Sequence, residues 1–263
     1  MLYIELLGRV NVSIGSERRP LRLTRQSATE LAYFAATRGQ LHSREHLIER
    51  FWPEEETSRG RANLSSAIWR LQRTLRGGAA PALSVDSMGD IGFERNAPIW
   101  LDSEYFERVL ATAFASPRGP LDKPLLCELV KALDLYRGEY MPGWYDDWVL
   151  AQRERLHALR FRSKLRLLEH HEALDELEDA IDCGRELLRM DALRETVHRR
   201  LMCIYAKNGE PAKAISQYRM LERMLKSELG VRPSAQTEAL YREFMAPLRT
   251  EPSIPVRAIP SRL

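Results

Sequence analysis

The sequence predicts an α+β fold, in which an N-terminal winged helix-turn-helix is followed by an all-α, TPR-like helical domain. Strand-like alternation of apolar residues is confined to the first hundred residues. From Leu101 onward, apolar residues recur at helical spacing instead. Within that helical part, residues 177–189 and 211–223 resemble each other at an offset of 34 residues. That offset is the period of the paired helices in TPR repeats.

The first elements are expected to be a small antiparallel sheet and two helices. Val10, Val12 and Ile14 alternate on one face, a turn follows at GSERRP, and LRLT continues as a second strand. The segment RQSATELAYFAATRG predicts a helix that ends at Gly39, and REHLIERFW predicts a shorter one that Ser43 caps and Pro53 stops. The inward residues expected for the longer helix are Ala28, Leu31, Ala32 and Ala35.

Residues 57–78, TSRGRANLSSAIWRLQRTLRGG, predict a third helix with five arginines and no acidic residue. Thr57 or Ser58 is expected to cap it, and Gly77 with Gly78 to end it. LSVDSMGDIGFE then predicts two short strands around a turn at residues 88–90. The order of sheet, three helices and hairpin is that of a winged helix-turn-helix, and the arginine helix occupies the recognition position. Its apolar row is Leu64, Ile68, Leu71 and Leu75.

The remaining chain predicts seven helices and a proline-containing tail. We therefore expect a DNA-binding domain over 1–97, a helical domain over 98–248 and a tail over 249–263. The helices are expected near residues 102–115, 121–137, 146–170, 173–189, 193–207, 211–229 and 234–247.

The positive charge of the chain is concentrated at its N-terminal end. The net charge of the 263 residues is +3, and residues 1–100 hold 14 arginines, no lysine and 11 acidic residues, whereas the rest is balanced. Such a local arginine field suits phosphate groups. No signal peptide or membrane-spanning run is expected, so the sequence predicts a cytoplasmic protein with no membrane contact. Cys127, Cys183 and Cys203 lack zinc-ligand spacing and are expected to be buried thiols.

Two parts of the sequence resemble a known family. GRANLSSAIWRLQRTLRG followed by GDIGFE resembles the recognition helix and wing of OmpR-type regulators, in the form found in Streptomyces antibiotic regulatory proteins (SARPs). ALDLYRGEYMPGWYDDWVLAQRERL and GEPAKAISQY…LKSELGVRPS resemble the helical bacterial transcriptional activator domain of the same proteins. The resemblance covers residues 2–247 and implies an activator that binds promoter DNA as a homodimer on direct repeats and contacts RNA polymerase. The DNA-reading face departs from the family at Ser66, Ala67 and Trp69.

The candidate DNA contacts lie on and around the arginine helix. Small side chains allow a close approach to the floor of the major groove, and arginine can bind guanine or phosphate. The alternative is a solvated basic face, and for Arg44 and Arg95 an ordinary surface role is equally plausible. Base contacts are expected from Ser65, Ser66, Trp69, Arg70 and Arg73, and phosphate contacts from Arg44, Arg61, Arg76 and Arg95.

No catalytic residue, metal or cofactor is expected, so the sequence does not predict an enzyme. HSREH at 42–46 matches a zinc-hydrolase pattern, but Ser43 as helix cap leaves His42 outside the helix. The aromatic residues of 136–148 fit a helix-junction core better than a ligand pocket, and the sequence does not identify whether an effector binds. One alternative function stays open, a TPR-like protein-interaction scaffold whose winged domain contacts protein.

Overall fold

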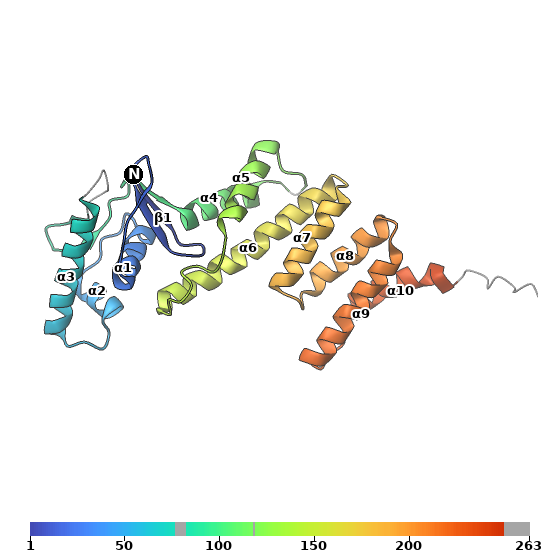
Figure 1. Ribbon diagram of the computed structural model, residues 1–263. Coiled ribbons are helices and arrows are strands. Elements are labelled where there is room, and N and C mark those ends of the chain that lie inside the picture. Colours follow the sequence, from blue (N-terminus) through green and yellow to red (C-terminus); the bar gives the residue numbers. More distant parts are fainter. Residues whose placement is uncertain (77–82, 118, 250–263) are drawn as a thin grey trace, which may run out of the picture. The chain divides into compact units, whose positions relative to one another are not determined.

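The computed structural model describes residues 1–76, 83–117 and 119–249. The described chain is mainly helical, with a small sheet at its N-terminal end (Figure 1). It divides into two compact units. The first unit contains residues 1–116 and 122–160, and the second contains residues 117–121 and those from 161 onward.

A four-stranded sheet opens the first unit. Its strands are β1 (Leu2–Glu5), β2 (Asn11–Ile14), β3 (Arg19–Pro20) and β6 (Ile99–Leu101), in the order β3-β2-β1-β6. The antiparallel pairing of β2 with β3 agrees with the predicted small antiparallel sheet, and β1, for which no separate strand was predicted, also pairs antiparallel with β2. The parallel pairing of β6 with β1 was not predicted, because a partner so distant in sequence leaves no local periodicity.

The predicted second strand, LRLT (residues 21–24), is wrong. Strand β3 ends at Pro20, and only one further backbone bond, from Leu21 N to Val12 O at 2.8 Å, continues the pairing. Thr24 instead caps the next helix, since its side chain accepts a hydrogen bond from Ser27 N at 3.2 Å. The chain therefore leaves the edge of the sheet early in order to begin a helix.

Three helices follow, α1 (Arg25–Ala36), α2 (Arg44–Phe51) and α3 (Thr57–Leu75). Ser43 Oγ accepts a hydrogen bond from His46 N at 3.2 Å, which confirms the predicted cap of α2. The predicted hydroxyl cap of α3 is wrong: Glu56 is the N-cap, and it makes no side-chain capping bond. The predicted stop at Gly77 and Gly78 lies outside the described residues. The predicted inward residues of α1 are confirmed as buried: Ala28, Leu31, Ala32 and Ala35.

Helices α2 and α3 approach each other closely at Gly60. A Cβ added there would lie 2.5 Å from Ile48 Cγ2, so only glycine fits without displacement. The predicted hairpin after α3 is formed by β4 (Ser84–Val85) and β5 (Ile91–Gly92). His42 N and Ile91 N each donate to the other residue's carbonyl oxygen, at 3.0 and 2.9 Å. These bonds join the hairpin to the residues that lead into α2.

The first unit continues into the predicted helical domain. It includes α4 (Asp102–Ala115), α5 (Lys123–Leu135) and the beginning of α6 (Asp147–Ala173). Residues 137–141 run along residues 6–8, with Arg137 N, Gly8 N and Met141 N donating to Leu7 O, Glu139 O and Leu6 O. The Arg153 side chain donates to the carbonyl oxygens of Tyr140, Met141 and Trp144. Backbone hydrogen bonds therefore hold residues 137–141 against residues 6–8, which directly follow β1.

The second unit contains the rest of α6 and four further helices. Val197 and Leu201 of α8 are fully buried. The small residues at equivalent positions of the predicted repeat, Ala180 of α7 and Ala214 of α9, are also fully buried. The Tyr218 and Tyr241 rings stack with centroids 4.0 Å apart. The predicted helices are confirmed to within a few residues: α7 (Leu177–Met190), α8 (Glu195–Lys207), α9 (Pro211–Glu228) and α10 (Ala235–Arg249).

The prediction of three buried cysteines is wrong. Cys127 and Cys203 are exposed, and Cys183 is half-buried. The core face of α8 is formed by residues such as Leu201 and Ile204, and adjacent helical positions point about 100° apart, so Cys203 falls outside that face. An apolar neighbourhood in sequence did not indicate which face each thiol occupies.

Candidate nucleic-acid interface

The predicted apolar row of α3 anchors this helix in the first unit. Leu64, Leu71 and Leu75 are almost fully buried, and Ile68 is buried beside them. Ala67 is also fully buried, so assigning it to the DNA-reading face was wrong. Burial of these side chains stabilises the helix by roughly 1.5–3 kcal/mol for each large residue. It also fixes which side of α3 faces solvent.

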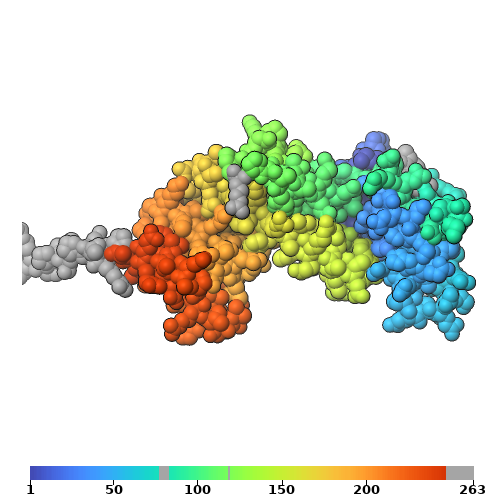
Figure 2. Space-filling model, turned by 180° about the vertical axis from the view of Figure 1, so that it is seen from behind, coloured from blue at the N-terminus to red at the C-terminus, as the bar shows by residue number. Residues whose placement is uncertain are grey.

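The opposite side of α3 is exposed and cationic. Trp69 keeps 57% of its surface accessible, which is unusual for the largest apolar side chain. In Figure 2 the segments coloured light blue to cyan, which include α2 and the beginning of α3, lie at the surface. The structure thus brings together on one exposed face seven of the predicted DNA contacts: Arg61, Ser65, Ser66, Trp69, Arg70, Arg73 and Arg76.

Two contacts join side chains of this face to one another. The Arg73 guanidinium carbon lies 5.1 Å from the centroid of the Trp69 ring, within cation–π range. Arg44 Nη2, from the first residue of α2, donates to Ser65 Oγ at 2.8 Å, and Ser65 Oγ donates to Arg61 O at 2.9 Å. Sequence reasoning found these residues but missed both contacts, since nothing in the spacing of Arg44 and Ser65 indicates that they meet.

The charge of the α3 face is not compensated locally. In the part of the chain that the structure describes, no ion pair involves Arg61, Arg70 or Arg73, whereas Arg59 Nε is paired with Glu55 Oε2 at 3.1 Å. Arg95, the predicted phosphate contact after the hairpin, is exposed as well. A row of cations without counter-charges attracts a polyanion.

One buried acid lies beneath this face. Glu30 of α1 is only 2% exposed, and neither carboxylate oxygen has a hydrogen bond of normal geometry. Burial raises the pKa of Glu30 to about 7, and the Gln26 side chain and the charge of Arg70 counteract this only in part. Glu30 was not singled out in the sequence, where it looks like an ordinary polar residue of an amphipathic helix.

Both histidines of the HSREH segment make structural hydrogen bonds. His42 Nε2 lies 2.9 Å from Thr37 Oγ1, and His46 Nε2 lies 2.9 Å from Tyr33 OH. These nitrogens are thus held by hydroxyl groups of α1 and its C-terminal end. The interpretation that His42 lies outside the helix is confirmed, because α2 begins at Arg44.

A second group of possible metal ligands was missed in the sequence. Across the described ranges, His170, His171 and Glu176 are the residues with ligand atoms close enough to share an ion. His170 is only 3% exposed, and its Nδ1 accepts a hydrogen bond from Leu121 N at 2.9 Å. A neutral ring that accepts at Nδ1 carries its proton on Nε2, so it offers a metal no free nitrogen.

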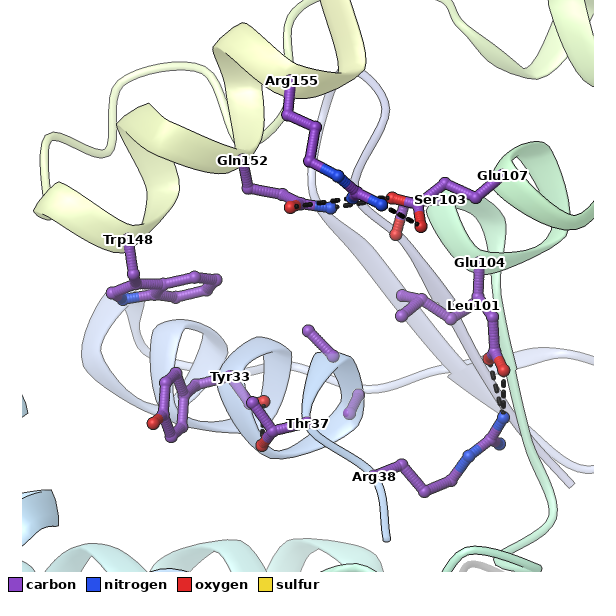
Figure 3. Close-up of a pocket in the computed structure, with 12 residues that line it drawn as sticks. Tyr33, Thr37, Arg38, Leu101, Ser103, Glu104, Glu107, Trp148, Gln152 and Arg155 are labelled. Atoms are coloured by element: carbon purple, nitrogen blue, oxygen red, sulfur yellow. Dashed lines mark hydrogen bonds and ion pairs between the residues drawn. The ribbon is translucent and has the colours of Figure 1, made fainter. Parts of the chain in front are cut away.

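A polar cavity of about 460 Å³ lies between α1, α4 and the beginning of α6 (Figure 3). Arg38 Nη2 donates to both carboxylate oxygens of Glu104, at 2.7 and 2.6 Å, whereas Arg155 Nη1 and Nη2 donate to one oxygen of Glu107 each. Figure 3 shows the two pairs on separate walls, with Tyr33 and Trp148 on a third side. Since each charged side chain in its described lining already has a partner, this cavity offers a ligand no unpaired charge.

The helical part defines the class of protein. Residues 101–245 match the family described as "Bacterial transcriptional activator domain", which is more than half of the chain. The chain therefore belongs to this family, and its sequence is SARP-like. Among the described residues, no helix is both long and apolar enough to cross a membrane.

Several known regulators are similar to this chain. The regulatory protein AfsR of Streptomyces coelicolor is 28% identical over 235 residues, which are 84% of this chain but 22% of AfsR. The transcriptional regulatory protein MoaR1 of Mycobacterium tuberculosis is 24% identical over 92% of this chain and 79% of its own length. The fold resembles that of M. tuberculosis EmbR, solved in complex with a low-affinity phosphopeptide. The TM-score is 0.73 at 21% identity, over 96% of this chain and 66% of EmbR.

Proposed function

We propose that this chain is a transcriptional activator that binds promoter DNA sequence-specifically, with residues 1–97 acting as a winged helix-turn-helix and α3 entering the major groove. The observation that carries the proposal is the exposed, uncompensated arginine face of α3 above its buried leucines. Arg70 and Arg73 are the proposed base readers, together with Ser65, Ser66 and Trp69. Arg44, Arg61, Arg76 and Arg95 are the proposed phosphate contacts.

The contacts within the face support this division of roles. Trp69 and Arg73 lie against each other, so the indole limits the directions in which this guanidinium can point. A side chain held in place loses less conformational entropy when it binds a base edge. Arg44 is held by Ser65 at the edge of the face, where a backbone phosphate would lie.

The helical residues 98–248 would supply dimerisation and contact with RNA polymerase. Side-by-side protomers on direct repeats need half-sites about one helical turn apart, so that both face the same side of the duplex. Transcription in vitro with purified bacterial RNA polymerase, from templates that carry one or two half-sites, tests this part separately from DNA binding.

Selection of duplexes from a random library, followed by fluorescence anisotropy with the selected site, tests the DNA proposal. The double variant Arg70→Ala with Arg73→Ala should lose specific binding. The matched control, Arg219→Ala with Arg223→Ala, removes two exposed arginines from α9 and should bind normally. Selection of no duplex, or equal binding by both double variants, would contradict the proposal.

A protein-interaction scaffold is the second candidate function. The 57% exposed Trp69 favours it, because exposed aromatic residues are frequent anchors of protein interfaces. In that case no duplex would be enriched by the selection. The double variant would then fail to bind a protein partner instead.

A further inference from the structure

A groove unrelated to α3 crosses the first unit between β2 and residues 21–24. Two adjoining cavities of about 670 and 310 Å³ form it. It exists because β3 ends at Pro20, so that residues 21–24 pass along β2 without strand pairing after Leu21. Both cavities share an apolar floor made of Val10, Val12, Leu21 and Leu23.

The smaller cavity gives the groove an apolar end. Trp144, Ala28, Thr24 and Arg25 line it in addition to the shared floor, and the Arg25 side chain is engaged with the Trp144 ring and Gly143 O. The indole is fixed, since Trp144 Nε1 donates to Thr29 Oγ1 at 2.7 Å and the Arg25 guanidinium carbon lies 5.0 Å from the ring centroid. This end of the groove can therefore receive an apolar side chain, because the indole does not have to rearrange first.

The larger cavity gives the groove a cationic end. Arg9, Arg22 and Arg137 line it, and all three are exposed. Within the described ranges, their side chains take part in no ion pair or hydrogen bond. The carboxylate that lines this cavity, Glu5, already binds Asn11 Nδ2 at 3.0 Å and Arg18 Nη1 at 3.8 Å. Three cations thus surround the apolar floor without a counter-charge of their own.

We propose that this groove binds an acidic, amphipathic peptide segment of a partner protein. Carboxylates of the peptide would pair with Arg9, Arg22 and Arg137, and an apolar side chain would enter the end lined by Trp144. The mixed lining favours a peptide over a nucleic-acid backbone, since sugar and phosphate make no use of four aliphatic side chains. Arginine beside an aromatic and aliphatic centre is also the composition typical of protein interfaces.

A selection with short random peptides displayed on phage, performed on the full chain, tests the proposal. The counter-selection uses the triple variant Arg9→Glu, Arg22→Glu, Arg137→Glu. Enriched peptides should combine several acidic residues with at least one large apolar residue. Their affinity, measured by anisotropy, should fall by about tenfold or more in the triple variant. The indole resonance of Trp144, assigned with Trp144→Phe, should shift when such a peptide is added.

A matched control separates this site from general electrostatics. Arg219→Glu, Arg223→Glu, Arg232→Glu reverses three exposed arginines of the second unit and should leave peptide binding within about twofold of the wild type. Equal losses in both triple variants, enriched peptides without acids, or no enrichment would overturn the proposal. If no peptide is enriched and the groove variant loses duplex binding instead, the three arginines contact DNA. If the protein binds such peptides but no duplex, the proposed DNA-binding function fails and the proposed peptide groove stands.

Discussion

Arg73 combines two functions in one side chain. It covers part of the exposed Trp69 ring and carries an unpaired charge on the α3 face. We expect Arg73→Ala to cost about 1–3 kcal/mol of specific DNA binding if it reads a base. Anisotropy with the selected duplex and with a scrambled duplex measures the difference. A loss that is equal for both duplexes would assign Arg73 to phosphate contact instead.

Glu30 should make the stability of the first unit depend on pH. Its pKa is raised from 4.5 to about 7 by burial, so the folded state binds the proton more tightly than the unfolded state. The stabilisation by this proton is fully present below pH 4.5 and is lost as pH rises through 7. Relative to Glu30→Gln, wild-type stability should therefore fall by about 2–3 kcal/mol between pH 5 and pH 8.

Chemical unfolding at several pH values measures this difference. The buried Asp102, whose pKa burial raises to about 6, titrates in both proteins and cancels from the comparison. Glu49→Gln, an exposed glutamate of α2, serves as the control and should follow the wild type. Parallel stability profiles of wild type and Glu30→Gln would refute the assignment.

The packing of α2 on α3 depends on Gly60. Alanine inside a helix normally stabilises it by about 1 kcal/mol relative to glycine. At Gly60 the new methyl group would lie 2.5 Å from Ile48 Cγ2, so we expect Gly60→Ala to destabilise the protein by about 1–3 kcal/mol. Combining it with Ile48→Ala should give a favourable coupling energy in a double-mutant cycle. Stabilisation by the single change would contradict this account.

The helices were predictable from sequence and much of the sheet was not. Periodic apolar residues and local caps such as Ser43 are signals within a few residues of the element they define. The pairing of β6 with β1, and of residues 137–141 with residues 6–8, joins segments far apart in the chain. The same reason explains why the arginine face was found but the Arg44–Ser65 contact and the buried Glu30 were not.

Cooperative folding of the first unit should require residues beyond 97. A fragment of residues 1–97 lacks β6, the partner of β1, and the backbone bonds between residues 6–8 and 137–141. It also lacks Trp144, the hydrogen-bond donor to Thr29. We expect residues 1–160 to show one sharp thermal transition by circular dichroism and residues 1–97 to show none. A cooperative transition of the shorter fragment would instead support 1–97 as an independent domain.

The proposed dimer on DNA should bind with a strong salt dependence. If each protomer neutralises roughly four phosphates, the logarithm of the binding constant should fall with the logarithm of salt concentration at a slope of about −7. Binding isotherms at several salt concentrations give the slope directly. A slope near zero would exclude phosphate contact by the arginines around α3, whatever the affinity.

The exposed thiols provide two natural attachment points for dyes. Cys127 belongs to the first unit and Cys203 to the second, so the unmodified sequence places one label in each. The third thiol should react slowly, because burial raises the pKa of Cys183 to about 11. Energy transfer between dyes on Cys127 and Cys203 would report any change in separation of the two units when the protein binds a duplex.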